Sequence, residues 1–146
     1  MIRVLYVNDS PDDRDILRIS IARLSDDIMV RPAGSAAEAI QTIKREKPDC
    51  IVSDLDMPGM NGLELLRALR NSGDQTPFIF FSCHDYTDLT ELALLAGAHS
   101  FEVKGPGKEP LKKLVSKIRD AAEENQADHR ADTSRQAGGL ALSTWT

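Results

Sequence analysis

Short runs of apolar residues alternate along the chain with stretches whose apolar residues recur every three or four positions. The runs are typical of buried β-strands, and the stretches are typical of amphipathic α-helices. Five strands are predicted, at Ile2–Val7, Ile28–Ala33, Cys50–Asp54, Pro77–Ser82 and His99–Val103. A helix is predicted after each strand, with apolar stripes formed by Ile16, Leu17, Ile21 and Leu24, by Ala36, Ala39, Ile40 and Ile43, by Leu63, Leu66 and Leu69, by Leu89, Leu92, Ala93 and Ala96, and by Leu111, Leu114, Val115, Ile118 and Ala122.

This alternation of strands and helices predicts an α/β fold. Neighbouring parallel strands need long crossover connections, which helices usually supply, so we expect a doubly wound parallel sheet with helices on both faces. Ser35 is the expected N-cap of the second helix, and Glu38 is expected to complete a capping box. Ligands of such sheets bind beyond the carboxyl ends of the strands, where the strand order reverses.

The helical periodicity ends near Asn125, and the residues that follow are mostly small or polar. We expect one domain over residues 1–124 and a flexible C-terminal tail or linker over residues 125–146. The second segment is too short for a DNA-binding or enzymatic output domain. The sequence therefore predicts a stand-alone domain or a fragment of a longer protein.

The composition narrows the class of protein further. The chain has 146 residues, of which 41% are hydrophobic and 28% are charged, as in ordinary soluble domains. Its net charge of -5 provides no overall basic surface for nucleic acid. It contains neither an apolar run near the ~20 residues of a membrane helix nor a secretory signal, and its two cysteines lack metal-binding spacing. We expect a cytoplasmic protein without a direct nucleic-acid or membrane partner.

Polar residues at the ends of four predicted strands are the candidates for chemistry. The carboxyl ends of parallel strands share one edge of the sheet, so these side chains are expected to converge there. Clustered carboxylates repel one another unless a cation joins them, and oxygen ligands of this kind suit Mg²⁺, which also binds phosphate. A lysine and a hydroxyl can hold the other oxygens of a phosphoryl group, while a carboxylate forms an acyl phosphate as the nucleophile. The residues concerned are Asn8, Asp9, Asp54, Asp56, Ser82 and Lys104.

The segment from Asp54 to Gly62 reads Asp-Leu-Asp-Met-Pro-Gly-Met-Asn-Gly, and Lys104 follows it at a suitable distance. Together they resemble the signature of the receiver domain of two-component response regulators, of the chemotaxis-regulator type. The resemblance covers Ile2 to Glu124. It implies a flavodoxin-like (βα)5 fold with strand order 2-1-3-4-5. It also implies a signalling switch phosphorylated on aspartate within a phosphorelay, and not a metabolic enzyme.

The same resemblance assigns a role to each residue that matches the family pattern. Asp54 is the expected phosphoacceptor. Mg²⁺ is the expected cofactor, held by Asp9, by Asp54 and by the backbone carbonyl of Asp56. Ser82 and Lys104 are expected to hold the phosphoryl oxygens, and Ser82 together with Phe101 is expected to form the conformational switch.

The resemblance also implies partners. The phosphoryl donor is expected to be a sensor histidine kinase or a phosphotransfer protein. A downstream protein is expected to bind the face formed by the last two helices and the last strand, around residues 89–96, 99–103 and 111–122. A homodimer that depends on phosphorylation is a further partner that the resemblance allows.

Three positions depart from the family pattern. Asn8 replaces a second acidic residue; its amide could hold a metal-bound water, but the lost charge predicts weaker Mg²⁺ binding. Gly105 follows Lys104 where the family usually has proline, so the Lys104–Gly105 bond is expected to be trans, because a cis bond there costs ~3 kcal/mol. Phe101 lacks the hydroxyl of the commoner tyrosine.

Two alternative functions fit part of the sequence. A phosphatase of the haloacid-dehalogenase type also places an Asp-x-Asp motif at a strand end, as in Asp54-Leu55-Asp56, but Met57 and Pro58 follow it and Asp9 precedes it. A degenerate receiver that acts only as a binding module is the second alternative. Asn8 and Gly105 favour it slightly, whereas Asp54 and the other matching residues argue against it.

Overall fold

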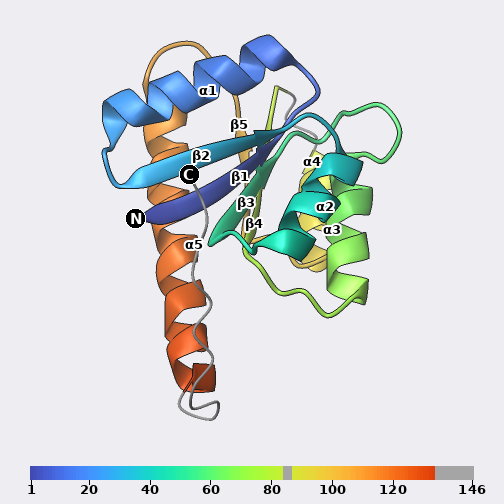
Figure 1. Cartoon of the computed structure of the whole chain (residues 1–146). Coiled ribbons are helices and arrows are strands. Elements are labelled where there is room, and N and C mark those ends of the chain that lie inside the picture. The colour runs from blue at the N-terminus through green and yellow to red at the C-terminus, as the bar shows by residue number, and fades with distance from the viewer. Residues whose placement is uncertain (84–86, 134–146) are drawn as a thin grey trace.

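The computed structural model of the chain describes residues 1–83 and 87–133 (Figure 1). Within these residues, strands and helices alternate as the hydrophobic pattern predicts. In chain order they are β1 (Ile2–Val7), α1 (Pro11–Leu24), β2 (Ile28–Ala33), α2 (Ala36–Arg45), β3 (Cys50–Ser53), α3 (Gly62–Asn71), β4 (Phe78–Ser82), α4 (Thr87–Leu95), β5 (Ser100–Val103) and α5 (Glu109–Thr133).

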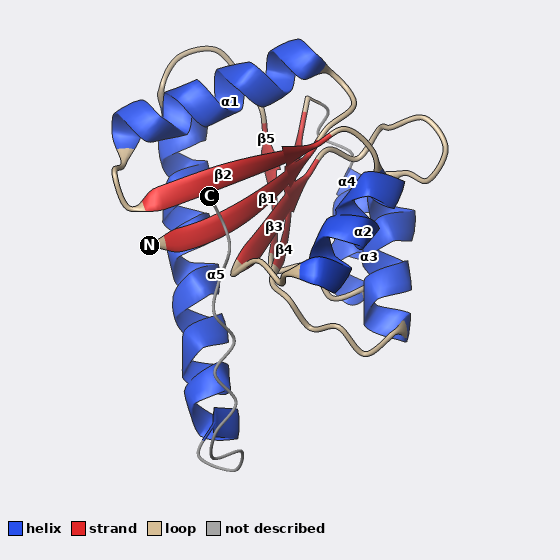
Figure 2. Cartoon of the chain, in the orientation of Figure 1, coloured by secondary structure: helices blue, strands red, loops and turns tan. Residues whose placement is uncertain are grey.

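The strands form one parallel sheet in the order β2-β1-β3-β4-β5. Helices α1 and α5 cover one face of the sheet, and α2, α3 and α4 cover the other (Figure 2). The predicted fold class and strand order are therefore confirmed. The strand order reverses between β1 and β3, so the carboxyl ends of these two neighbouring strands meet where ligands of such sheets bind.

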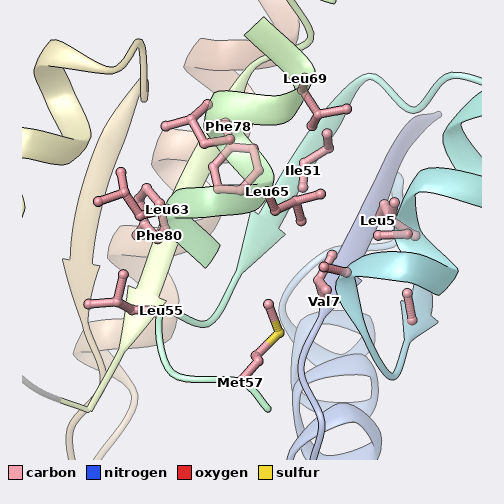
Figure 3. Packing of buried hydrophobic residues seen from close by; sticks show 14 of the residues in the cluster. Leu5, Val7, Ile51, Leu55, Met57, Leu63, Leu65, Leu69, Phe78 and Phe80 are labelled. Atoms are coloured by element: carbon pink, nitrogen blue, oxygen red, sulfur yellow. The ribbon is translucent and has the colours of Figure 1, made fainter. Parts of the chain in front are cut away.

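Alternating side chains of β1 supply both halves of the core. Leu5 and Val7 pack toward α2, α3 and α4, in the cluster drawn in Figure 3. Val4 and Tyr6 pack in the second cluster, with α1 and α5. All residues of β4 are buried, as its strong hydrophobicity predicts for a strand with neighbours on both sides.

Polar caps stabilise the starts of the helices, and the capping box predicted for α2 was partly wrong. Ser35 Oγ accepts a hydrogen bond from the Glu38 N–H, as expected. The Glu38 carboxylate, however, accepts from the N–H of Gly34 at 2.8 Å, so it reaches one residue further back than a capping box requires. The reciprocal box occurs instead at α3, between Asn61 and Glu64.

Two of the predicted helical stripes are narrower than expected. On α1, Leu17 and Ile21 are buried, but Ile16 is 61% exposed and Leu24 is also exposed. Ile16 is rotated by about 100° from Leu17 around the helix axis, which turns it away from the sheet. On α4, Leu92 is exposed and its neighbour Ala93 is buried, because adjacent residues are again about 100° apart around the helix axis.

Helix α5 continues to Thr133, well past the predicted end of the helical pattern near Asn125. Its last buried side chains among those described are Ala121 and Ala122. The residues that follow include several good helix formers, such as Glu, Gln, Ala and Arg, so the backbone continues as a helix without an apolar stripe. The rest of the predicted tail, residues 134–146, lies outside the described residues. No helix in the described ranges has the length and apolar content needed to cross a membrane.

Removing all residues after Asn125 should leave the folded domain stable. No side chain that the structure describes as buried is lost, because the last one is Ala122. Thermal unfolding followed by circular dichroism should give a midpoint within a few degrees of that of the full chain. A chain ending at Val115, which lacks buried Ile118, Ala121 and Ala122, is the matched control and should unfold at a much lower temperature. A large drop for the longer truncation would show that the tail stabilises the domain.

Candidate functional site

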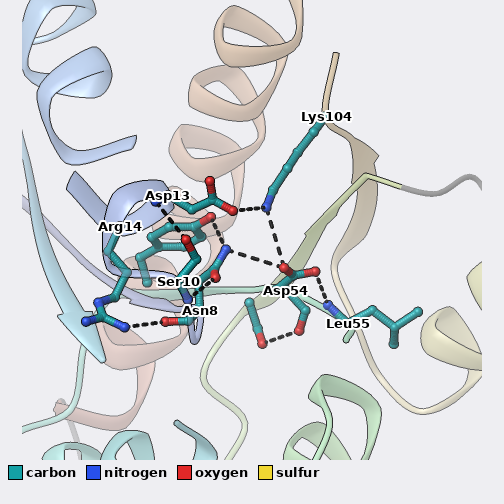
Figure 4. Close-up of polar contacts among 9 residues, drawn as sticks. Asn8, Ser10, Asp13, Arg14, Asp54, Leu55 and Lys104 are labelled. Atoms are coloured by element: carbon teal, nitrogen blue, oxygen red, sulfur yellow. Dashed lines mark hydrogen bonds and ion pairs between the residues drawn. The ribbon is translucent and has the colours of Figure 1, made fainter. Parts of the chain in front are cut away.

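Asp54 directly follows β3 at the point where the strand order reverses. Its N–H donates to the carbonyl of Val7 at 2.9 Å, which fixes it against the end of β1. Its side chain is only 15% exposed, and Oδ1 accepts a hydrogen bond from the Leu55 N–H at 2.8 Å (Figure 4). The other oxygen, Oδ2, faces the side chains of Asn8 and Lys104.

Gly62 allows the chain after Asp54 to return against the sheet. Its N–H donates to the carbonyl of Leu55 at 2.9 Å. A Cβ atom at Gly62 would lie 2.3 Å from the carbonyl oxygen of Asp54 and 2.9 Å from the ring of Phe80. Only glycine allows α3 to begin so close to Asp54. The Asn61-Gly62 pair therefore serves two purposes, because Asn61 caps the helix and Gly62 provides the close approach.

Lys104 reaches the same point from the end of β5. Its N–H donates to the carbonyl of Ser82 at 2.7 Å, which fixes the two strand ends together. Its ammonium Nζ lies 3.5 Å from Asp54 Oδ2, and its side chain is 17% exposed. Within the described part of the chain this buried nitrogen has no hydrogen-bond partner; it makes ion-pair contacts and lies 5.7 Å from the centre of the Phe81 ring. The site thus holds a buried cation with unused donors beside a carboxylate.

Asn8 is buried at the end of β1, with its amide held in one orientation. Its Oδ1 accepts from the Ser10 N–H at 2.9 Å, so Nδ2 is the atom that faces the site. Nδ2 donates to the Tyr6 hydroxyl at 2.9 Å and to Asp54 Oδ2 at 3.4 Å. A metal-bound water needs an acceptor, and the amide oxygen is turned away from the site. The expectation that Asn8 holds such a water is therefore not supported in this arrangement.

Burial and charge act in opposite directions on the ionisable groups of the site. Burial raises the pKa of Asp54, although Lys104 and the N–H groups of Leu55 and Asp56 lower it in part. Burial lowers the pKa of Lys104, but Tyr6 and Asp54 together with other nearby groups outweigh it, so the pKa is raised. Lys104 consequently remains a cation at neutral pH.

The other predicted metal ligands lie at the surface. Asp9 and Asp56 are both exposed. No group of three or more His, Cys, Asp or Glu side chains in residues 1–83 and 87–133 could hold a metal ion. The predicted ligand set needs only two carboxylates and one backbone carbonyl, and oxygen donors of this kind fit Mg²⁺, which keeps several of its waters.

Ser82 and Phe101 occupy the neighbouring strands β4 and β5. Ser82 is buried at the carboxyl end of β4, opposite Val103 in the strand register. Phe101 is half-buried and stacks on Phe80, with ring centroids 5.6 Å apart. The described residues contain no cis peptide bond, so the Lys104–Gly105 bond is trans as expected.

The structure adds two residues to the site that the strand-end argument missed. Tyr6 is buried, and its hydroxyl accepts from Asn8. A tyrosine between the aliphatic residues Leu5 and Val7 could have indicated this, because a buried hydroxyl usually has a polar partner. Asp13, in the first turn of α1, lies 3.8 Å from Lys104 Nζ. No sequence signal separates Asp13 from its neighbour Asp12.

A doubly wound sheet with a carboxylate after its third strand and a lysine after its fifth is the arrangement of a receiver domain. The family model described as response regulator receiver domain matches residues 4–116, and the chain belongs to this family.

Curated relatives include the transcriptional activator protein ExaE of Pseudomonas putida, 34% identical over 111 residues that cover 73% of this chain and 52% of that protein. The response regulator MprA of Mycobacterium leprae is 30% identical over 131 residues, 90% of this chain and 55% of that protein. The chain thus spans about half the length of these relatives.

Solved structures of receiver domains match over nearly their full length. The response regulator domain of Thermotoga maritima CheB has a TM-score of 0.75 and 32% identity, covering 84% of this chain and 97% of that one. The response regulator TrrA of Thermotoga maritima, solved in complex with Mg²⁺ and BeF, has a TM-score of 0.69 and 25% identity, covering 81% and 99%. The chain is therefore similar to complete receiver domains.

Proposed function

We propose that this chain is a phosphorylation switch in which Asp54 accepts a phosphoryl group in a Mg²⁺-dependent reaction. The observation that supports this most directly is the pairing of Asp54 Oδ2 with the buried Lys104 ammonium at 3.5 Å. A carboxylate that is kept close to a cation with unused donors can take on further negative charge at that place.

The chemistry is transfer of a phosphoryl group to a carboxylate. Asp54 Oδ2 has longer contacts, at 3.4 and 3.5 Å, than the 2.8 Å hydrogen bond that Oδ1 accepts, so Oδ2 is the nucleophile. It forms a bond to phosphorus while the bond from phosphorus to the donor's leaving group breaks. Lys104 then donates hydrogen bonds to the phosphoryl oxygens, and Ser82 supplies a hydroxyl donor.

Mg²⁺ would be held by the carboxylates of Asp9 and Asp54 and by the backbone carbonyl of Asp56. When bound, it offsets the negative charge of the carboxylates and of the incoming phosphoryl group. The comparison with TrrA, whose structure contains Mg²⁺ and BeF, supports this assignment.

The phosphoryl donor is a sensor histidine kinase or a phosphotransfer protein, and the output is a change of affinity at the face formed by α4, β5 and α5. Exposed apolar side chains lie on this face, among them Leu94, Leu95 and Val103. Phe101 stacks on Phe80 and packs against the core, so a change of its rotamer would alter the surface around β5.

The test is incubation with acetyl phosphate, in which Asp54 displaces acetate. With Mg²⁺ the intact mass should increase by one phosphoryl group, and with EDTA it should not. A phosphatase of the haloacid-dehalogenase type would instead release phosphate over many turnovers. A degenerate receiver, which the neutral Asn8 favours, would show neither labelling nor turnover.

Asn8→Asp is expected to tighten Mg²⁺ binding. The substitution replaces an amide donor, 3.4 Å from Asp54 Oδ2, by a negative charge next to the metal ligands. The expected gain is ~1 kcal/mol at the effective dielectric of a partly solvated cleft, or about fivefold in Kd. Calorimetric titration with MgCl2 measures it. Unchanged or weaker binding would show that residue 8 lies outside the reach of the metal.

A further inference from the structure

Lys104 lies between two carboxylates that come from different elements. Its Nζ is 3.5 Å from Asp54 Oδ2 and 3.8 Å from Asp13 Oδ2 (Figure 4). Asp54 follows β3, whereas Asp13 belongs to the first turn of α1. The side chain of Asp13 is 47% exposed, so its charge is partly screened by solvent but is not removed.

We propose that Asp13 is a positioning residue of the phosphorylation site, which holds part of the Lys104 charge and thereby weakens the binding of a phosphoryl group on Asp54. This inference rests on the proposed function and adds to it. Through Asp13, helix α1 would contribute directly to the stability of the phosphorylated state.

The balance of charge around the Lys104 ammonium changes when Asp54 is phosphorylated. In the unphosphorylated protein, Lys104 is shared between Asp13 and Asp54. A phosphoryl group on Asp54 carries up to two negative charges where the carboxylate carries one, so it adds about one negative charge beside the same ammonium. It must compete with Asp13 for Lys104, and it is also repelled by Asp13 across a short distance. Removal of the Asp13 charge should therefore favour the phosphorylated state.

Helix capping does not explain why the Asp13 carboxylate lies beside Lys104. The contact between Asp13 and the N-cap Ser10 is made by the backbone, because the Asp13 N–H donates to Ser10 Oγ at 3.3 Å. A carboxylate in the first turn also stabilises the helix dipole, but Asp12 does so equally. Asp12 is exposed, and no contact joins it to Lys104 within the described residues. Asp12→Asn is therefore a matched control that removes the same charge from the same turn.

The experiment is a calorimetric titration of the full chain with beryllofluoride, which mimics a phosphoryl group, in saturating Mg²⁺. It measures the affinity of the chain for beryllofluoride. Asp13→Asn should bind it about three- to tenfold more tightly than the wild type, the range for a half-exposed charge at this distance. Asp12→Asn should stay within about twofold, since its charge is exposed and screened. Asp13→Glu should return to near the wild-type affinity. Urea unfolding of each variant establishes that the differences do not come from lost stability.

Equal or weaker binding by Asp13→Asn would overturn the inference. Equally tighter binding by Asp12→Asn would show that the effect belongs to the charge of the whole helix terminus. Failure of Asp13→Glu to restore the wild-type affinity would show that the effect comes from packing and not from charge. Either result would overturn the inference. If the wild type binds beryllofluoride and Asp13→Asn does not differ from it, the proposed function stands without this inference. If the wild type binds none, both are wrong.

Discussion

Asp54→Asn is expected to abolish phosphorylation. The amide is a poor nucleophile, and it carries no charge to pair with Lys104, whose Nζ lies 3.5 Å from Asp54 Oδ2. After incubation with acetyl phosphate and Mg²⁺, the wild-type chain should gain one phosphoryl mass and the variant none in intact-mass spectrometry. The substitution is nearly isosteric, so the loss should occur without unfolding.

Asp12→Asn provides the control for this experiment, because Asp12 is an exposed aspartate on the same chain. It should be labelled to the same extent as the wild type. Full labelling of the Asp54→Asn variant would place the phosphoacceptor on another residue. It would also remove the main support for the function proposed above.

Gly62→Ala should destabilise the domain by about 3 kcal/mol, at the upper end of what overpacking costs. The new Cβ would lie 2.3 Å from the carbonyl oxygen of Asp54, and backbone atoms yield less readily than a flexible side chain. Helix propensity alone would favour alanine by ~1 kcal/mol, so the expected sign depends on the clash. Urea unfolding measures the change. Labelling by acetyl phosphate should also become slower, since relief of the clash displaces Asp54.

Gly105→Ala is the matched control for this substitution. A Cβ at Gly105 would meet its nearest atom, on Pro110, at 3.5 Å, which is an ordinary contact. Stability should therefore change by less than about 1 kcal/mol. If Gly62→Ala unfolded at the same urea concentration as Gly105→Ala, α3 would be able to move away from Asp54 at little cost.

The fold could be predicted because its signal is repeated in every strand and helix. The short apolar runs place all five strands to within one residue, and the three-to-four-residue stripes mark the helix that follows each strand. Ile16 and Leu24 were expected in the α1 stripe but are exposed, because the width of a buried stripe depends on how the helix sits on the sheet. The continuation of α5 to Thr133 was missed because the prediction followed apolar periodicity and not helix propensity.

The site was predictable only as far as strand ends define it. The topology brings Asn8, Asp54 and Lys104 together, as the parallel order requires. It does not determine which end of the Asn8 amide faces Asp54, because that depends on the Ser10 N–H and the Tyr6 hydroxyl. The position of Asp13 was also missed, since it depends on the rotation of α1 about its own axis.

Helix α5 is anchored to the sheet along one part of its length and continues beyond it. Its last described buried side chain is Ala122, while the helix ends at Thr133. At 1.5 Å per residue, the helical segment after Ala122 is about 16 Å long. A tilt of about 10° at its base would move the far end by roughly 3 Å, following the same geometry. A small displacement of α5 beside β5 would therefore become a larger one at the far end of the helix, at a distance from Asp54.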